Sequence, residues 1–367
     1  MKLITYVFIL FFSVSCTEQF QHGKGSTMVE KSEKSILKEK GWTGDNAEKI
    51  SNFLLRHGKE GGVAIFDWDN TVIKNDMGDA LFFHMVETGS FPAVSDFADL
   101  SIFFTDEAVA ALNETCLDSI DGGRIRSDID KKCARELLSV YDRAETTDGN
   151  PAFSGFDENR TEPSYALLAH MLGGLTGREI KHKTEKLFAR LLKEPVGSEK
   201  IVGGFKVPDY VRIYPQIKEL IKLMNDYGFD VRIVSASPQE VVEVCAEKAG
   251  VTADKVIGIR NVKKGDVLTR EIRGCGDVED SENTMITYKL GKRCWINSKI
   301  FKKENPCEKQ PEKYRPVFGA GDSDTDIFFM KDAVHLRLLI DRDKPLITEE
   351  ARLNKDGKWI VQPMFIK

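Results

Sequence analysis

Positive charge is not in excess in this chain of 367 residues, which has 53 Lys and Arg against 58 Asp and Glu, a net charge of -5 and a pI near 5.8. Binding to the phosphate backbone of nucleic acid needs a concentrated basic surface. The composition therefore argues against nucleic acid as a partner. Because 41% of the residues are apolar and 30% are charged, the chain is not a disordered one and can fold as a large globular domain.

Cysteine and histidine are scarce, with seven and six residues, and none shows the spacing of metal ligands. Cys245 falls on the apolar face of a predicted helix, which indicates a buried thiol. An oxidising compartment would permit disulfides. Cys116 and Cys133 are one candidate pair. A second pair could form between two of the remaining three cysteines, Cys275, Cys294 and Cys307. Spacing alone does not fix the connectivity.

Long apolar runs are lacking as well, because the run at residues 3–12 is shorter than the about 20 residues that span a bilayer. It follows Lys2 and precedes small residues, which predicts an export signal over residues 1–16. Cleavage would leave Cys16 first, which resembles the lipidated cysteine of a bacterial lipoprotein, although Ser13 stands where such signals usually carry Leu. Ordinary secretory cleavage fits as well. We expect an exported protein, either secreted or a lipoprotein of the periplasm or cell envelope, and a membrane contact only through such an anchor.

The polar composition of residues 17–40 is typical of a linker. The folded body is then predicted to begin with a helix, in which Asp45 and Glu48 make a capping pair and Gly58 marks the end.

Short apolar runs predict four strands that are buried on both faces, at residues 63–66, 231–234, 316–320 and 334–340. Helical patterns lie between them: one begins at Pro215, and another opens with Ser237 as its cap. This alternation predicts an α/β fold with a doubly wound, Rossmann-like parallel sheet. Helical patterns without strands fill the middle of the chain, so we expect an inserted, mainly helical cap at 79–210 between core segments 41–78 and 211–367.

Two carboxylates, Asp67 and Asp69, follow the first predicted strand directly, and a loop there can point both toward one site. A calcium-binding loop is one alternative, but such a loop needs Gly at its sixth position and Glu at its twelfth. The sequence has Val72 and Gly78 at those positions, which argues against this alternative.

The chain resembles the haloacid dehalogenase superfamily in this segment, since Asp67-Trp68-Asp69-Asn70-Thr71 matches the family motif DxDxT. The second family motif, a strand that ends in Ser, matches at Ser235. The fourth, GDxxxD, matches residues 321–326, where Asp322 and Asp326 are the acidic positions. The third is a single lysine; Lys292 is the best candidate, and Lys289 and Lys299 are close enough to compete.

The resemblance implies a Mg²⁺-dependent phosphatase in which Asp67 attacks phosphorus and Asp69 acts as general acid and base. It further implies that Mg²⁺ is held by Asp67, the backbone carbonyl of Asp69, and Asp322. The family pattern places Asp326 behind the metal ligands. It places the remaining residues around the phosphate: Asn70, Thr71, Ser235, Ser237 and Lys292. A phosphomutase or phosphotransferase, and a noncatalytic envelope protein that binds a phosphorylated ligand, would keep the same fold.

The substrate is expected to be a small phosphomonoester. Residues 70–79 extend the likeness toward the branch that includes phosphoserine and phosphorylcholine phosphatases, in which an acidic residue at the position of Asp76 faces the substrate ammonium. Aromatic residues of the cap are either helix core or a cage for a quaternary ammonium: Phe82, Phe83, Tyr165 and Tyr210.

Overall fold

Six strands pair side by side, all in parallel, as one sheet in the order β14-β13-β12-β1-β8-β9. The computed structural model describes residues 35–275 and 285–366 of the chain. The strands of the sheet are β1 (Gly62–Phe66), β8 (Phe229–Pro238), β9 (Val256–Ile259), β12 (Phe318–Gly321), β13 (Leu336–Asp341) and β14 (Trp359–Pro363). The sheet confirms the α/β fold expected from the sequence.

Helices cover both faces of this sheet, because alternate residues of each strand point to opposite sides. In β1, Ala64 and Phe66 belong to one buried apolar cluster, while Ile65 belongs to a second. The first cluster includes buried residues of α1 (Asn46–His57), α7 (Pro215–Asp226) and α8 (Gln239–Glu247). The second includes buried residues of α9 (Leu290–Lys299), α10 (Ile327–Asp332) and α11 (Pro345–Leu353). The sheet is therefore doubly wound.

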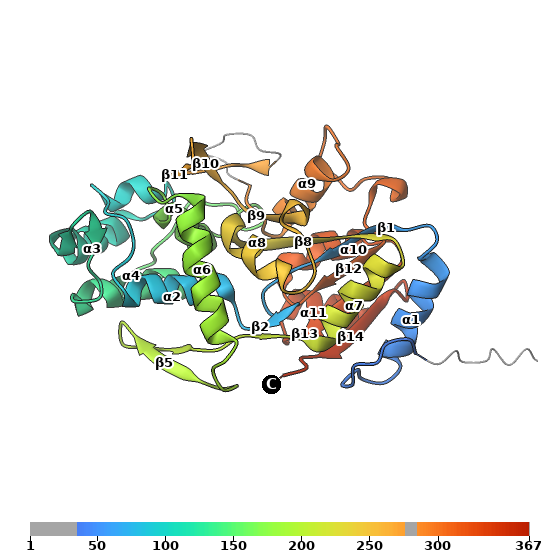
Figure 1. Ribbon diagram of the computed structural model, residues 1–367. Helices are drawn as coiled ribbons and strands as arrows, with labels where there is room; N and C mark the ends of the chain where they lie inside the picture. Colours follow the sequence, from blue (N-terminus) through green and yellow to red (C-terminus); the bar gives the residue numbers. More distant parts are fainter. Residues whose placement is uncertain (1–34, 276–284, 367) are drawn as a thin grey trace, which may run out of the picture. The chain divides into compact units, whose positions relative to one another are not determined.

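The segment between the first two core strands is mainly helical, as the sequence indicated. It contains α2 (Met77–Glu87), α3 (Asp106–Cys116), α4 (Lys131–Arg143), α5 (Pro163–Met171) and α6 (Gly177–Leu191). Figure 1 shows these five helices on the side of the molecule away from β12, β13 and β14. We call residues 75–211 the inserted segment. Residues 35–366 group as one compact unit rather than two, so the cap boundaries at 79 and 210 stay a prediction.

Short antiparallel pairs complete the described part of the chain. They are β2 (Ile73–Lys74) with β7 (Arg212–Ile213), β3 (Ile120–Asp121) with β4 (Arg124–Ile125), β5 (Glu199–Val202) with β6 (Phe205–Pro208), and β10 (Asn261–Lys264) with β11 (Val267–Ile272). Single 3₁₀ turns occur at Phe97–Leu100, Leu117–Ser119, Ala253–Lys255, Glu312–Tyr314 and Asp324–Asp326. The β2–β7 pair brings the start and the end of the inserted segment side by side.

The predicted capping pair at the first helix is wrong. Helix α1 does span Asn46–His57 with Gly58 at its end, but the Asp45 side chain makes no capping hydrogen bond. Its carboxylate instead forms an ion pair with Lys49, at 3.0 Å, one turn further along. Such an i, i+4 pair competes with the cap for the same carboxylate oxygens.

The predicted export signal, with Cys16, lies outside the described residues, as does most of the predicted linker. The linker residues that are described contact the folded body: Leu37 is buried, and the Ile36 backbone N–H donates to the Ser51 hydroxyl at 3.1 Å. Within residues 35–275 and 285–366, no helix is both long and apolar enough to cross a bilayer.

Two disulfides match the pairings that the sequence left open. Cys116 is bonded to Cys133 and Cys275 to Cys294, while Cys245 is a buried free thiol. The first disulfide joins the end of α3 to the first turn of α4.

Removing the first disulfide should destabilise the protein. The bond closes a loop with a sequence separation of 17 residues. A disulfide across a loop of this size stabilises the folded protein by about 3 kcal/mol. We expect the double change Cys116→Ser with Cys133→Ser to lower the free energy of unfolding by about that amount, measured by urea titration without reductant. The difference between the two proteins should disappear when both are titrated in reductant; a difference that persists would show that packing of the sulfur atoms is responsible.

Candidate active site

The carboxyl ends of three neighbouring strands bring the predicted motif residues together. Asp67 and Asp69 follow β1, Ser235 lies in β8, and Asp322 follows β12. Since β1 lies between β8 and β12 in the sheet, these side chains meet although 166 positions of the chain separate Asp69 from Ser235. Carboxylate oxygens of Asp67, Asp322 and Asp326 lie within 4.8 Å of one another.

The turn after β1 is shaped by its own sequence. Asn70 adopts a positive φ of 61°, a conformation that Asn tolerates better than most residues. The turn places the buried Thr71 hydroxyl 2.9 Å from Asp67 Oδ2 and 3.1 Å from Asp322 Oδ1. Thr71 therefore connects the two carboxylates, and its single proton can be donated fully to only one of them.

Lys292 on α9 is the lysine that reaches this cluster. Its fully buried Nζ lies 2.6 Å from Asp67 Oδ1 and 2.6 Å from Asp326 Oδ1. Burial alone would lower the pKa of Lys292, but the two carboxylates hold it above its ordinary value, so the side chain stays charged. Of the three lysines considered from the sequence, Lys289 precedes this helix and Lys299 lies near the Trp295 ring.

Asp326 is fixed by the loop that carries it. Its Oδ2 accepts the backbone N–H groups of Asp322 and Ser323 at 3.0 and 3.2 Å. The loop has no room for a side chain at Gly321, where a Cβ would lie 2.6 Å from the Asp326 Cβ. The glycine of the GDxxxD motif is therefore required by the packing of the second acidic residue of that motif.

Asp69 is held by three donors in a buried position. The Met77 backbone N–H donates to Oδ1 at 2.8 Å, the Ser237 hydroxyl to Oδ2 at 2.7 Å, and the Ser235 hydroxyl to Oδ2 at 3.4 Å. The prediction that Ser237 caps the following helix is wrong. Helix α8 begins only at Gln239 with no side-chain cap, because the Ser237 hydroxyl is engaged with Asp69.

Burial governs the acidity of this cluster. It raises the pKa of Asp67 to about 6, with Lys292 opposing the shift and Asp322 adding to it. It raises the pKa of Asp69 to about 7, with the Met77 hydrogen bond opposing, and the pKa of Asp326 to about 6, with Lys292 opposing. Carboxyl groups with such values exchange protons close to neutral pH, which is a property of acid and base catalysts.

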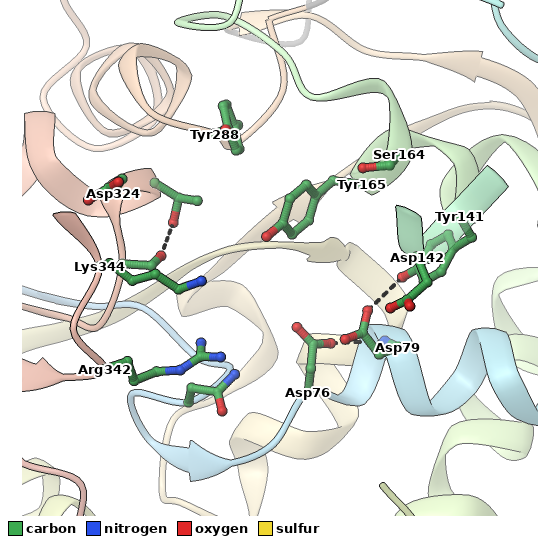
Figure 2. Close-up of a pocket in the computed structure, with 13 residues that line it drawn as sticks. Asp76, Asp79, Tyr141, Asp142, Ser164, Tyr165, Tyr288, Asp324, Arg342 and Lys344 are labelled. Atoms are coloured by element: carbon green, nitrogen blue, oxygen red, sulfur yellow. Dashed lines mark hydrogen bonds between the residues drawn. The ribbon is translucent and has the colours of Figure 1, made fainter. Parts of the chain in front are cut away.

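A wider cavity of about 360 Å³ adjoins the narrow space above Asp67 and Asp69. Asn70, Asp76, Tyr165 and Arg342 line both spaces. Figure 2 shows Arg342, Lys344 and Asp324 on one side of the cavity and Asp76, Asp79 and Asp142 on the other. The first side carries two basic groups and one carboxylate and the second carries three carboxylates, so we call them the basic wall and the acidic wall.

Hydrogen bonds hold both walls in place. Asp76 caps α2 through the Asp79 backbone N–H at 2.9 Å, and the Tyr141 hydroxyl donates to Asp79 Oδ1 at 2.9 Å. On the other wall, Arg342 Nη1 lies 2.7 Å from Asp322 Oδ2. Arg342 thus joins the wide cavity to the carboxylate cluster.

Only one of the four aromatic residues considered from the sequence lines the cavity. Tyr165 lines the cavity, whereas Phe82 and Phe83 are buried in the apolar core and Tyr210 does not line the cavity. Tyr141 and Tyr288, which the sequence did not single out, do line it. No local pattern distinguishes them from ordinary core tyrosines.

Comparisons with known proteins support this fold. No family model matches the chain, and no curated protein matches it either. A solved structure of a conserved protein of unknown function from Anaerococcus prevotii is similar, with a TM-score of 0.64 at 20% identity, covering 89% of this chain and 94% of that one. This likeness shows a shared fold.

Two further solved structures match less well. A protein of unknown function from Bordetella pertussis has a TM-score of 0.49 at 14% identity and covers 83% of this chain and 99% of that chain. A substrate-bound phosphoserine phosphatase has a TM-score of 0.37 at 15% identity and covers 79% and 90%.

Replacing Asp79 should change how stability depends on pH. Burial raises its pKa from 3.8 to about 6, and Asp142 adds to the shift while Tyr141 opposes it. The folded protein therefore keeps this proton to a higher pH than the unfolded chain, so the contribution of Asp79 to stability is lost as pH rises from 4 to 7. We expect Asp79→Asn, which can still accept the Tyr141 hydrogen bond, to raise the free energy of unfolding at pH 7 by about 1–3 kcal/mol.

Urea titrations at pH 4 and pH 7 in chelator test this expectation. The gain should be small at pH 4 and present at pH 7. Asp148→Asn, at an exposed loop position, is the matched control and should leave both values unchanged. An equal gain from Asp79→Asn at both pH values would contradict the assignment.

Proposed function

We propose that this protein is a phosphatase of the haloacid dehalogenase type, which hydrolyses a small phosphomonoester through a phosphorylated Asp67. The observation that carries the proposal is that Asp67, Asp69 and Asp322, which follow neighbouring strands, line one narrow space, with Lys292 bonded to the first of them.

Asp67 is the proposed nucleophile. A carboxylate oxygen of Asp67 attacks phosphorus and displaces the alcohol, and water then hydrolyses the aspartyl phosphate, which divides one displacement into two easier ones. Lys292 stays charged beside this carboxylate, so it can offset negative charge that gathers during the transfer.

Asp69 is the proposed general acid and base. With a pKa of about 7, it can hold a proton for the leaving alcohol and then, once deprotonated, take one from the attacking water. The hydrogen bonds from Met77 and Ser237 keep its carboxyl group oriented. The narrow space that Asp69 shares with Ser235 and Asn70 is the proposed phosphate position.

The carboxylate cluster fits a magnesium ion. Hard oxygen ligands suit Mg²⁺, and carboxylate oxygens of Asp67 and Asp322 lie within 4.8 Å of each other. The family resemblance adds the backbone carbonyl of Asp69 as the third proposed ligand. Asp326 is already engaged with Lys292 and two backbone N–H groups, which favours a supporting role for it. When bound, the ion offsets the repulsion between a phosphate dianion and these carboxylates.

The acidic wall of the wide cavity supports an amine-bearing leaving group. Asp76 lines both the narrow phosphate space and the wide cavity, so it can face a group attached to the phosphate oxygen. Asp79 and Asp142 add negative charge on the same side, and Tyr165 and Tyr288 offer aromatic faces to an ammonium. Phosphoethanolamine, phosphocholine and phosphoserine are the proposed substrate class.

Export is proposed as well. Disulfides form and persist mainly in oxidising compartments. The pairs Cys116–Cys133 and Cys275–Cys294 support a protein that works outside the cytoplasm, in agreement with the apolar run at residues 3–12.

Asp67→Asn should abolish hydrolysis, because an amide is a poor nucleophile toward phosphorus. We expect kcat to fall by at least about a thousandfold, measured as free phosphate released, while the thermal midpoint stays within a few degrees of wild type. Asp254→Asn, at an exposed position of the 3₁₀ turn before β9, is the matched control. An active Asp67→Asn enzyme would refute the proposal.

Removal of divalent cations should also stop hydrolysis. Mg²⁺ restored after chelation should return the activity and raise the thermal midpoint, because an ion that binds only the folded state stabilises it. Asp322→Asn should weaken both effects of Mg²⁺. Full activity in excess chelator would exclude the proposed metal.

Asp76→Asn should change specificity rather than chemistry. We expect KM for phosphoethanolamine to rise about tenfold, because the ammonium loses a partly buried charge partner, while kcat/KM for ethyl phosphate, which has no amine, changes little. Steady-state kinetics on this substrate pair gives both values. An equal loss on both substrates would assign Asp76 to the structure of the α2 cap instead.

A further inference from the structure

Arg342 lies at the candidate active site although no sequence motif marked it. It follows strand β13, which neighbours β12 in the sheet, so it reaches the edge where Asp322 lies. Its Nη1 donates to Asp322 Oδ2 at 2.7 Å. The Asp322 side chain is 3% exposed, whereas the Arg342 side chain is 31% exposed and lines the wide cavity. The ion pair therefore joins the buried carboxylate cluster to accessible space.

The charge of Asp322 is compensated by this contact. Lys292, the other cation of the cluster, bonds to neighbouring carboxylates instead. The Thr71 hydroxyl lies 3.1 Å from Asp322 Oδ1, but it also lies 2.9 Å from Asp67 Oδ2 and has a single proton to donate. Arg342 is thus the charged partner of Asp322.

A metal ion held by Asp322 would compete with this guanidinium. The proposed function makes Asp322 a ligand of Mg²⁺, so one carboxylate serves two cations. Two positive charges a few ångströms apart repel each other strongly where water is largely excluded. An Asp322 carboxylate that binds the ion therefore holds Arg342 less tightly.

The narrow space offers Arg342 a second partner. Arg342 is the one basic residue among the described residues that line the proposed phosphate position. Figure 2 shows its guanidinium extending from the basic wall into the cavity, toward Asp76. The planar guanidinium donates parallel hydrogen bonds to phosphate oxygens, which makes arginine well suited to bind a phosphate dianion.

We propose that Arg342 is a shared counter-ion: it neutralises Asp322 in the metal-free protein and binds the substrate phosphate once Asp322 holds Mg²⁺. The inference rests on the proposed function, which supplies both the metal ligand and the phosphate position. Arg342 forms no covalent bond and moves no proton in this role. Its hydrogen bonds pass from a carboxylate to a phosphate, so binding of the metal and binding of the phosphate favour each other.

Isothermal titration of Mg²⁺ into the metal-free full chain tests the first half of this proposal. Arg342→Gln should bind Mg²⁺ about tenfold more tightly than wild type, because a competing charge is removed from Asp322. If Arg342 only held Asp322 in place, the same variant would bind Mg²⁺ more weakly. Tighter binding therefore supports the exchange, and unchanged or weaker binding would overturn it.

Titration of inorganic phosphate into the Mg²⁺-saturated protein tests the second half. Arg342→Gln should bind phosphate at least about tenfold more weakly, because a charge-assisted contact is lost. One substitution then changes the two affinities in opposite directions, which a purely structural role does not produce. Unchanged phosphate binding would contradict the proposed contact.

Lys344→Gln is the matched control for both titrations. It removes the same charge from the same wall, but Lys344 lines only the wide cavity and is exposed. Both affinities should change by less than about twofold, because an exposed charge is screened by solvent and salt. Shifts as large as those of Arg342→Gln would assign the effect to general electrostatics and overturn the proposal.

A second variant keeps the test decisive if the thermal midpoint shows that Arg342→Gln is unfolded. Arg342→Lys retains the charge but loses the planar fork of donors. It should bind Mg²⁺ at least as tightly as wild type and phosphate at least about threefold more weakly. Weaker Mg²⁺ binding by Arg342→Lys would show that Arg342 merely supports Asp322.

The wild-type protein separates failure of this inference from failure of the proposed function. Mg²⁺ binding that is weakened by Asp322→Asn, together with release of phosphate from a phosphomonoester, would uphold the function whatever Arg342→Gln does. Only the role of Arg342 would then be overturned by an unchanged Arg342→Gln. Absence of both Mg²⁺ binding and phosphate release in wild type would overturn the function and this inference together.

Discussion

The ammonium group of Lys292 lies between the carboxylates of Asp67 and Asp326, and the arrangement of the strand ends depends on this contact. Acidic residues from β1 and β12 are brought within 4.8 Å of one another in a buried space, where their mutual repulsion is poorly screened. A fully buried cation that bonds to two of them compensates part of that charge. Breaking such a pair leaves an uncompensated buried charge, which is strongly destabilising. Helix α9 is thereby fixed against the sheet at the point where the chemistry is proposed.

In the wide cavity next to this cluster, basic and acidic side chains lie on opposite walls. Arg342 bonds to Asp322 and reaches the wide cavity, so the basic wall is continuous with the acidic cluster below it. The opposite wall is acidic and comes from α2 and α4 of the inserted segment. The basic groups of this cavity thus come from the core and the three carboxylates that face them come from the insertion, and the proposed leaving group would lie between them.

Much of the core could be predicted from the sequence, because buried parallel strands appear as short apolar runs and their carboxyl ends meet at one edge of the sheet. Strands at 63–66 and 231–234 lie within β1 and β8, and the motif residues after them converge. The two outer strands, β9 and β14, were missed. Val256–Ile259 contains a glycine and Trp359–Pro363 contains a glutamine, and neither gives a clear continuous apolar run.

The walls of the cavities could not be predicted, since each joins segments that are distant in the chain. Tyr141 meets Asp79 across 62 residues and Arg342 meets Asp322 across 20, and neither contact leaves a periodic pattern. Ser237 shows the same limit at short range. Its sequence has the form of a helix cap, yet the hydroxyl bonds to Asp69, 168 residues away. Local propensity was overridden there by a buried acceptor that has to be satisfied.

The pairing of β2 with β7 has an evolutionary consequence. Ile73 lies opposite Ile213 and Lys74 opposite Arg212, so the chain leaves the core and returns to it through neighbouring positions. The entropy of closing a loop grows only slowly with its length. Beyond the turn that carries Met77, whose backbone N–H holds Asp69, lineages can therefore lengthen, shorten or exchange the chain between these two strands while the sheet order is preserved, and new specificities can arise there.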